Sequence, residues 1–243
     1  MENGYPMLSN LKTVVTGGSG RFGSNLRKVN KVNFFYPSKK ELDILNQKSI
    51  YNYLKKKKAK RLIHLAGLSR PMSIHDKNIS LSIQLNIIGT SNIVIVCQKL
   101  NIKLIYFSTS YVYPGGKGNY KESDPLLPFN NYAWSKLGGE SAVQMYKNSL
   151  ILRVSTTEEP FVHQSAFADM ITNFIYHNDF IKIFNKILNK KGVLNIGGPS
   201  QSVYDFVKKN NPKIKRIYLK NNKNIKMPNN ISMNLNMLKK YIK

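Results

Sequence analysis

A tyrosine and a lysine stand four residues apart in the segment YAWSK, as Tyr132 and Lys136. On a helix this spacing places both side chains on one face. A free phenol ionises at about pH 10, and a neighbouring ammonium group favours its ionised form. Tyr132 is therefore a candidate acid–base group for proton exchange with a substrate oxygen, and Lys136 is its candidate partner.

Three hydroxyl side chains in a row, Ser108 to Ser110, add to this pair. They follow the apolar segment 103–107, so we expect them at the carboxyl end of a buried strand. A sheet covered by helices on both faces places its site at this edge. A hydroxyl group there can hydrogen-bond the same oxygen that Tyr132 serves, which favours a catalytic interpretation over chance spacing.

A glycine-rich segment, TGGSGRFG at 16–23, follows the first expected strand and opens the first expected helix. In this context its glycines suit a tight turn, close approach of a pyrophosphate, and packing of helix on strand. The helix N-terminus adds free N–H groups and positive potential. The sequence thus favours a dinucleotide cofactor over an ordinary glycine turn. The candidate contacts are Gly17, Ser19, Gly20, Arg21, Phe22 and Gly23.

The type of nicotinamide cofactor depends on the end of the second expected strand, which reads YPSKK at 36–40. This run contains no acid for a ribose 2′-hydroxyl, and Ser38 and Lys39 can meet a 2′-phosphate. NADP(H) is therefore preferred over NAD(H), although Lys39 is also compatible with an ordinary surface lysine. Asp43, with its neighbour Ile44, is a candidate for adenine contact, or else for capping the next helix.

Strands and helices alternate along most of the chain, which predicts an α/β fold with a doubly wound, Rossmann-like parallel sheet. We expect a cofactor-binding domain at 11–155 and a small substrate-binding cap at 156–243, with strand 193–197 returning to the main sheet. Segment 166–176 is ambiguous, and Asp179 is a possible N-cap of a helix at 179–189. The expected strands are 11–16, 31–36, 61–65, 103–107, 149–154 and 193–196, and the main helices are 21–30, 47–58, 80–99, 131–147 and 202–209.

Composition excludes several other classes of protein. The chain carries 38 Lys and Arg against 12 Asp and Glu, but its few arginines and scattered lysines favour a solvated basic surface over a nucleic-acid partner. This field still attracts anionic cofactors and substrates. A single cysteine, Cys97, no apolar run of about 18 residues and no leader pattern in 1–10 favour a cytoplasmic protein without a membrane span. The four histidines lack metal-ligand spacing, so no metal site is expected.

Together these segments resemble the extended short-chain dehydrogenase/reductases that act on nucleotide sugars. Within that family, STSYVY and ELDI are most similar to the dTDP-4-dehydrorhamnose reductase branch. The resemblance covers most of residues 11–210. The matching segments are TGGSGRFG at 16–23, HLAG at 64–67, NIIGTSN at 86–92, FSTSYVYPG at 107–115, YAWSK at 132–136, LRVS at 152–155 and NIGGPSQSVYDF at 195–206.

The resemblance implies roles for individual residues. Tyr132 would be the catalytic acid, Lys136 would lower its pKa and hold the nicotinamide ribose, and Thr109 would polarise the sugar carbonyl. Asn86 would lie near the substrate, while Leu65, Ala66 and Gly67 would line the cofactor cleft. Independently of the family, Arg70 follows an expected strand at the carboxyl edge and is a candidate clamp for a sugar diphosphate, or else a loop arginine in solvent.

The implied activity is NAD(P)H-dependent reduction of a nucleotide-linked 4-keto-6-deoxy sugar for deoxysugar or surface-polysaccharide synthesis. An NAD-dependent epimerase and a non-catalytic cofactor-binding relative are the alternatives. Ser110 stands where the reductase branch has Asp, and Ser110 and Tyr111 replace the Asp-Glu pair of the dehydratases. Segment 155–164 lacks the Tyr-Gly-Pro of the epimerases. Helices 80–99 and 131–147 are candidates for a homodimer interface.

Overall fold

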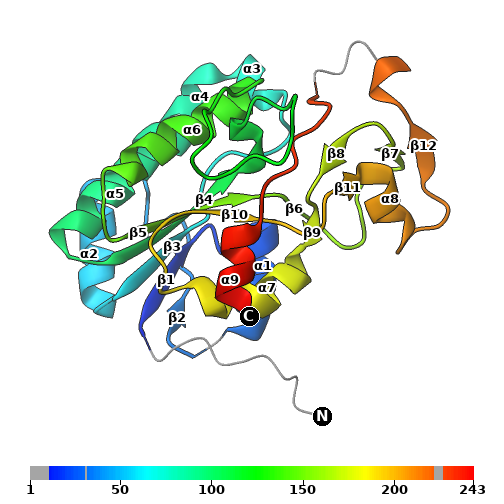
Figure 1. The fold of residues 1–243 in the computed structure, drawn as a ribbon. Helices are drawn as coiled ribbons and strands as arrows, with labels where there is room; N and C mark the ends of the chain where they lie inside the picture. Colours follow the sequence, from blue (N-terminus) through cyan, green and yellow to red (C-terminus); the bar gives the residue numbers. More distant parts are fainter. Residues whose placement is uncertain (1–10, 31, 222–226) are drawn as a thin grey trace.

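A six-stranded parallel sheet forms the centre of the computed structural model, which describes residues 11–30, 32–221 and 227–243 (Figure 1). The strand order is β10-β5-β4-β3-β1-β2, so β1 lies between β2 and β3, where the strand order reverses. This is the predicted doubly wound, Rossmann-like architecture. The strands are β1 (Thr13–Thr16), β2 (Phe34–Phe35), β3 (Arg61–His64), β4 (Lys103–Thr109), β5 (Ser149–Val154) and β10 (Gly192–Ile196).

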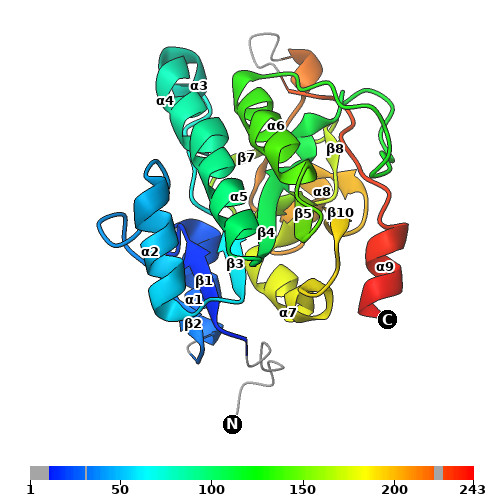
Figure 2. The same cartoon turned by 90° about the vertical axis from the view of Figure 1, so that its left-hand side faces the viewer.

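Helices cover both faces of the sheet (Figures 1 and 2). Val14 and Val15 of β1 point to opposite faces and join two separate apolar clusters, as the period of a strand requires. One face carries α1 (Arg21–Val29), α7 (His177–Ile187) and α9 (Asn236–Ile242). The other carries α2 (Gln47–Lys57), the stretch α4 (Ile79–Ile83), η1 (Gln84–Ile88) and α5 (Gly89–Lys99), and α6 (Asn131–Gln144).

The stretch Ile79–Lys99 is continuous and π-helical at Gln84–Ile88. By length and mean hydropathy it is apolar enough to cross a membrane. In the fold, Ile93, Val96 and Cys97 of this stretch are buried in the cluster beneath α2 and α6. It is therefore a core helix of the α/β layer.

A smaller unit follows β5 and carries its own apolar cluster, which includes Val112, Tyr176 and Val207. The ambiguous segment 166–176 contributes to three short strands, each paired over only two or three residues. The elements of this unit are β6 (Thr156–Thr157), β7 (Ser165–Phe167), β8 (Ile171–Thr172), β9 (Ile175–Tyr176), β11 (Gln201–Ser202), α8 (Val203–Lys208), β12 (Lys215–Ile217) and η3 (Leu219–Asn221). Two short helical turns, α3 (Ile74–Lys77) and η2 (Ser110–Val112), precede β5 and follow β3 and β4, and Val112 of η2 joins the apolar cluster of the smaller unit.

Several expected boundaries change. Asp179 is not the N-cap of α7, because the chain passes directly from β9 into a helix capped by Tyr176, and Asp179 pairs with Lys182 at 2.7 Å. The second strand narrows to Phe34–Phe35. Residues 1–10, in which no leader was expected, lie outside the described residues. Lys31, the expected first residue of the second strand, also lies outside them.

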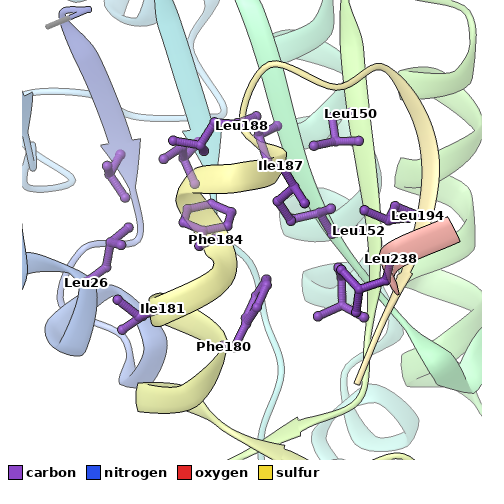
Figure 3. Close-up of a cluster of buried hydrophobic side chains, with 14 of the residues drawn as sticks. Leu26, Leu150, Leu152, Phe180, Ile181, Phe184, Ile187, Leu188, Leu194 and Leu238 are labelled. Atoms are coloured by element: carbon purple, nitrogen blue, oxygen red, sulfur yellow. The ribbon is translucent and has the colours of Figure 1, made fainter. Parts of the chain in front are cut away.

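The apolar layer beneath α7 gives a test of the packing (Figure 3). Phe184 is fully buried, with its ring 5.4 Å from Phe180 and 5.8 Å from Phe107 between centroids. We expect Phe184→Ala to lower the free energy of unfolding by about 3 to 5 kcal/mol, measured by equilibrium urea denaturation. Met145→Ala, at a side chain 86% exposed, should change it by no more than about 0.5 kcal/mol. Equal effects at the two positions would contradict this packing.

Candidate active site

The carboxyl ends of β1, β3, β4 and β5 open onto one cavity of about 700 Å³. The chain segments that supply it are far apart in sequence, and the parallel sheet brings them to one edge. The cavity wall contains most of the expected site residues: Gly17, Ser19, Gly20, Arg21, Phe22, Gly23, Leu65, Ala66, Gly67, Arg70, Thr109, Tyr132 and Lys136.

Tyr132 lies in the first turn of α6, which begins where the Asn130 side chain accepts a hydrogen bond from the Ala133 N–H at 2.8 Å. Its phenol lies near the Thr109 side chain at the end of β4, and both residues line the cavity. Burial raises the pKa of Tyr132, while the nearby Thr109 hydroxyl and the charges of Arg70 and Arg21 act to lower it. The geometry therefore presents two hydroxyl groups together to whatever occupies the cavity.

Lys136 lies one turn further along α6, with its ammonium 4.3 Å from the centroid of the Tyr106 ring. The Tyr106 hydroxyl donates to the backbone carbonyl of Lys136 at 3.0 Å, which ties the helix to β4. Burial lowers the pKa of Lys136 to about 7. Its charge is thus finely balanced at neutral pH.

The glycine segment packs directly against the loop after β3. Gly17 has φ +70°, and a Cβ there would lie 2.5 Å from the Ala66 nitrogen. A Cβ on Gly23 would lie 2.5 Å from the Gly17 carbonyl oxygen. Gly20 is the N-cap of α1, and no side chain among the described residues caps this helix. The exposed helix N-terminus beside a Cβ-free cradle fits the pyrophosphate of a dinucleotide.

Asn86 lies behind the cavity wall rather than in it. Its Oδ1 accepts from the Leu68 N–H at 2.7 Å, and its Nδ2 donates to the Leu68 carbonyl at 2.9 Å and to Ser135 Oγ at 2.8 Å. The fully used amide joins the loop after β3 to α6. The structure therefore places Asn86 as a support of the cavity, where the sequence had suggested a substrate contact.

Glu158 and His177 are among the cavity residues that the sequence did not single out. Glu158 Oε1 accepts from Arg21 Nη1 at 2.6 Å and from Arg70 Nη1 at 3.2 Å, so this carboxylate joins the glycine segment to the loop after β3. Burial acts to raise the pKa of Glu158, but both arginines outweigh it and the pKa is lowered. His177, at the start of α7, stands edge-on to Phe22 with ring centroids 5.6 Å apart. The run Glu158-Glu159 just past a strand was the only local signal.

The loop after β2 holds four expected cofactor contacts, Ser38, Lys39, Asp43 and Ile44, which do not line the cavity. The Ser38 N–H and Oγ both donate to Glu41 Oε2 at 2.9 Å. Asp43 accepts from the Leu45 N–H at 3.0 Å, and Asn46 rather than Asp43 caps α2. An acid is therefore present at this loop, as Glu41 directly follows the run 36–40.

Comparison with known proteins gives the family. The family described as RmlD substrate binding domain matches residues 11–187. This chain belongs to that family. Among curated relatives, it is 29% identical over 154 residues to the methionine adenosyltransferase 2 subunit beta of Xenopus laevis, covering 59% of this chain and 46% of that protein. It is 31% identical over 161 residues to a GDP-6-deoxy-D-talose 4-dehydrogenase of Aggregatibacter actinomycetemcomitans, covering 62% and 52%. The chain thus spans about half the length of these relatives.

Solved structures of this family and its neighbours share the fold. A dTDP-4-dehydrorhamnose reductase from Bacillus anthracis, in complex with NADP, superposes with a TM-score of 0.84 at 24% identity, covering 94% of this chain and 92% of that one. The Bordetella bronchiseptica enzyme WbmG, in complex with NAD, gives 0.76 at 16% identity, covering 100% and 89%. Structural relatives therefore bind NADP or NAD.

Beneath the cavity, His64 is a fully buried histidine with both ring nitrogens used. Nδ1 is 2.8 Å from Thr16 Oγ1, and Nε2 is 3.1 Å from Thr90 Oγ1. Burial lowers its pKa to about 3, and the charge of Lys136 adds to this effect. Among the described residues, no three His, Cys, Asp or Glu side chains form a metal-binding group. His64 is thus a neutral hydrogen-bonding residue in the folded protein.

This histidine makes stability dependent on pH. The unfolded chain binds a proton at His64 below about pH 6.5, whereas the folded chain does not, so its contribution falls as pH decreases. We expect the loss of unfolding free energy between pH 7.5 and 5 to be roughly 1 to 2 kcal/mol smaller in His64→Gln than in wild type. Urea denaturation at both pH values measures this. The exposed control His163→Gln should keep the wild-type loss; a His64→Gln variant that does the same would refute the assignment.

Proposed function

We propose that this protein reduces the keto group of a nucleotide-linked 4-keto-6-deoxy sugar with NAD(P)H. The observation that carries the proposal is that Thr109, Tyr132 and Lys136 line the same cavity as the glycine segment, with Lys136 one helical turn from Tyr132. Membership of the RmlD substrate binding domain family and the likeness to reductase structures support it. The place of the reaction would be deoxysugar or surface-polysaccharide synthesis.

Each group has a defined chemical role in this proposal. The nicotinamide cofactor would supply hydride to the keto carbon. Thr109 and Tyr132 donate hydrogen bonds to the keto oxygen, and Tyr132 gives up its proton as negative charge develops there. Lys136 in its charged form stabilises the resulting phenolate and binds the ribose of the cofactor. Arg70 and Arg21, which already lower the pKa of Tyr132, add positive charge at the same place.

Arg70 is the proposed substrate clamp. It lies in the cavity wall on the loop after β3, and its guanidinium is paired there with Glu158 at 3.2 Å. A planar guanidinium binds diphosphate oxygens well, so a sugar diphosphate would compete with Glu158 for it. The helix N-terminus at Gly20 and the backbone of the glycine segment would hold the cofactor pyrophosphate instead.

For the cofactor, we favour NADP(H). Lys39 and its neighbour Lys40 bring two positive charges to the loop after β2, and they suit a 2′-phosphate. The Glu41 carboxylate, which accepts both hydrogen bonds from Ser38, supports NAD(H) instead. The ratio of the dissociation constants for NADPH and NADH shows whether the lysines or the Glu41 carboxylate determine the cofactor preference.

The alternatives are an epimerase and a non-catalytic relative. An epimerase would keep its cofactor bound, so release of oxidised cofactor from denatured, purified protein would favour it. The non-catalytic alternative is supported by the relatives named as beta subunits of methionine adenosyltransferase 2. Cofactor binding without reduction of any keto sugar would favour that alternative.

The remaining proposals concern context. We place the protein in the cytoplasm without a membrane span, with residues 11–155 as the cofactor domain and 156–243 as the substrate cap, from which β10 returns to the main sheet and α7 and α9 pack against it. A homodimer through the helices at 79–99 and 131–144 is proposed because they lie side by side and expose Ile83, Ile95 and Trp134 (Figure 2). No nucleic acid is proposed as a partner.

The catalytic assignment is tested at Tyr132. We expect Tyr132→Phe to lower the rate of NADPH oxidation with dTDP- or UDP-4-keto-6-deoxyglucose by at least about 100-fold, because no other group supplies the proton. NADPH affinity, measured by fluorescence, should stay nearly unchanged. Tyr51→Phe on α2, away from the cavity, is the control and should keep wild-type turnover. Full activity in Tyr132→Phe would refute the mechanism.

The cofactor site is tested at two glycines. A Cβ on Gly23 would lie 2.5 Å from backbone oxygen and 2.8 Å from the Gly18 Cα, whereas one on Gly116 meets nothing within 4 Å. We expect Gly23→Ala to raise the dissociation constant for NADPH by about 10-fold or more, since α1 must move away from the cradle. Gly116→Ala should bind NADPH as wild type does. Unchanged binding in Gly23→Ala would place the cofactor elsewhere.

A further inference from the structure

A third residue of α6 continues the spacing of the catalytic pair. Glu140 follows Lys136 by four residues, as Lys136 follows Tyr132, so the three side chains lie on one helix face. Glu140 is only 1% exposed. A carboxylate this deeply buried is costly unless other groups compensate its charge and hydrogen-bonding capacity.

The compensation comes from two strands of the sheet. Glu140 Oε1 accepts from Arg153 Nε at 3.0 Å and from Arg153 Nη2 at 2.7 Å, and Oε2 accepts from Ser108 Oγ at 2.5 Å. Arg153, 3% exposed, also donates through Nη1 to the Tyr113 hydroxyl at 2.8 Å and to the Glu122 carbonyl at 2.9 Å. Every oxygen of the carboxylate is thus held in place.

The Glu140–Arg153 ion pair is connected to the active site through β4. Tyr106 and Ser108 are alternate residues on the face of β4 that meets α6. Tyr106 lies beneath the Lys136 ammonium, and Ser108 hydrogen-bonds Glu140. Ser108 also directly precedes Thr109, which lines the cavity together with Tyr132. The carboxylate therefore lies one helical turn below Lys136, fixed to the strand that carries the catalytic hydroxyl.

We infer that Glu140 is a positioning residue whose buried charge keeps the Lys136 ammonium protonated in the pH range where the site operates. The inference rests on the proposed function for its catalytic meaning. Burial removes Lys136 from water and favours its neutral amine, whereas a nearby carboxylate favours the ammonium form. The negative charge of Glu140 acts on Lys136 in this direction.

The other groups that face Lys136 do not supply this charge. Tyr106 on β4 and Tyr132 on α6 have pKa values raised by burial, so both are neutral near pH 7. His64 on β3 and His75 on α3 have pKa values lowered by burial, so both are uncharged there as well. Arg153 on β5 carries the opposite charge and is paired with Glu140 through Nε and Nη2, so Glu140 is the acidic group of this set.

The test follows the protonation of Lys136 directly in the cofactor-free protein. The rate of Lys136 acetylation by limiting acetic anhydride is measured against pH by peptide mass spectrometry, with the exposed Lys213 as internal reference. We expect Glu140→Gln to move the midpoint for Lys136 down by about one pH unit or more. Ser108→Ala removes a hydrogen bond but keeps the carboxylate, so its midpoint should stay at the wild-type value.

A second variant guards against loss of folding, because Glu140→Gln leaves the buried Arg153 guanidinium without a counter-charge. Glu140→Gln combined with Arg153→Met removes both charges and should still move the midpoint down, but by less than Glu140→Gln alone, because the Arg153 cation no longer opposes protonation of Lys136. A midpoint within about 0.3 pH units of wild type in the folded variants would overturn the inference. Such a result would leave Glu140 as a structural residue.

The outcome is distinguishable from that of the proposed function, because acetylation needs neither cofactor nor substrate. If Lys136 shifts but no keto sugar is reduced by wild type, the proposed function fails and the inference stands. If wild type is active, the alkaline limb of its kcat/KM profile should move to lower pH in Glu140→Gln. An unmoved limb together with an unmoved Lys136 midpoint would reject the inference in an active enzyme.

Discussion

The site depends on the direct contact of two backbones at the carboxyl ends of β1 and β3. Gly17 approaches the Ala66 nitrogen so closely that a Cβ would lie 2.5 Å from it. This contact places the first turn of α1 in the cavity wall, where no side chain among the described residues caps its free N–H groups. Without it, the helix N-terminus and the loop after β3 would not line the same space.

Polar groups buried beneath the cavity hold its wall in place. His64 joins β3 to Thr16 and Thr90, Asn86 joins the loop after β3 to α6, and Glu140 joins α6 to β4 and β5. Each side chain is satisfied by hydrogen bonds, which is what makes its burial tolerable. Satisfied networks of this kind favour a single arrangement of the hydroxyl and ammonium groups above them.

Two sets of charges lie at the cavity and beneath it. Glu158 pairs with Arg21 and Arg70, which are far from it in sequence, while Lys136 and Glu140 lie one turn apart on α6. Most of the excess of lysine lies elsewhere, on the outer surface, as scattered runs such as 55–58. The large net charge and the specific electrostatics of the site are therefore separate properties of the molecule.

The sequence by itself determined the layered α/β fold, the glycine cradle and the pairing of Tyr132 with Lys136. These features follow from local rules, since hydrophobic period, glycine conformation and helical spacing act over a few residues. Only the tertiary structure decided that Asn86 supports the cavity from behind, that Asp179 does not cap α7, and that Glu41 meets Ser38. It also revealed Glu158 and Glu140, whose partners come largely from other strands and loops. Local sequence patterns cannot predict such contacts, because these residues come together only when the sheet forms.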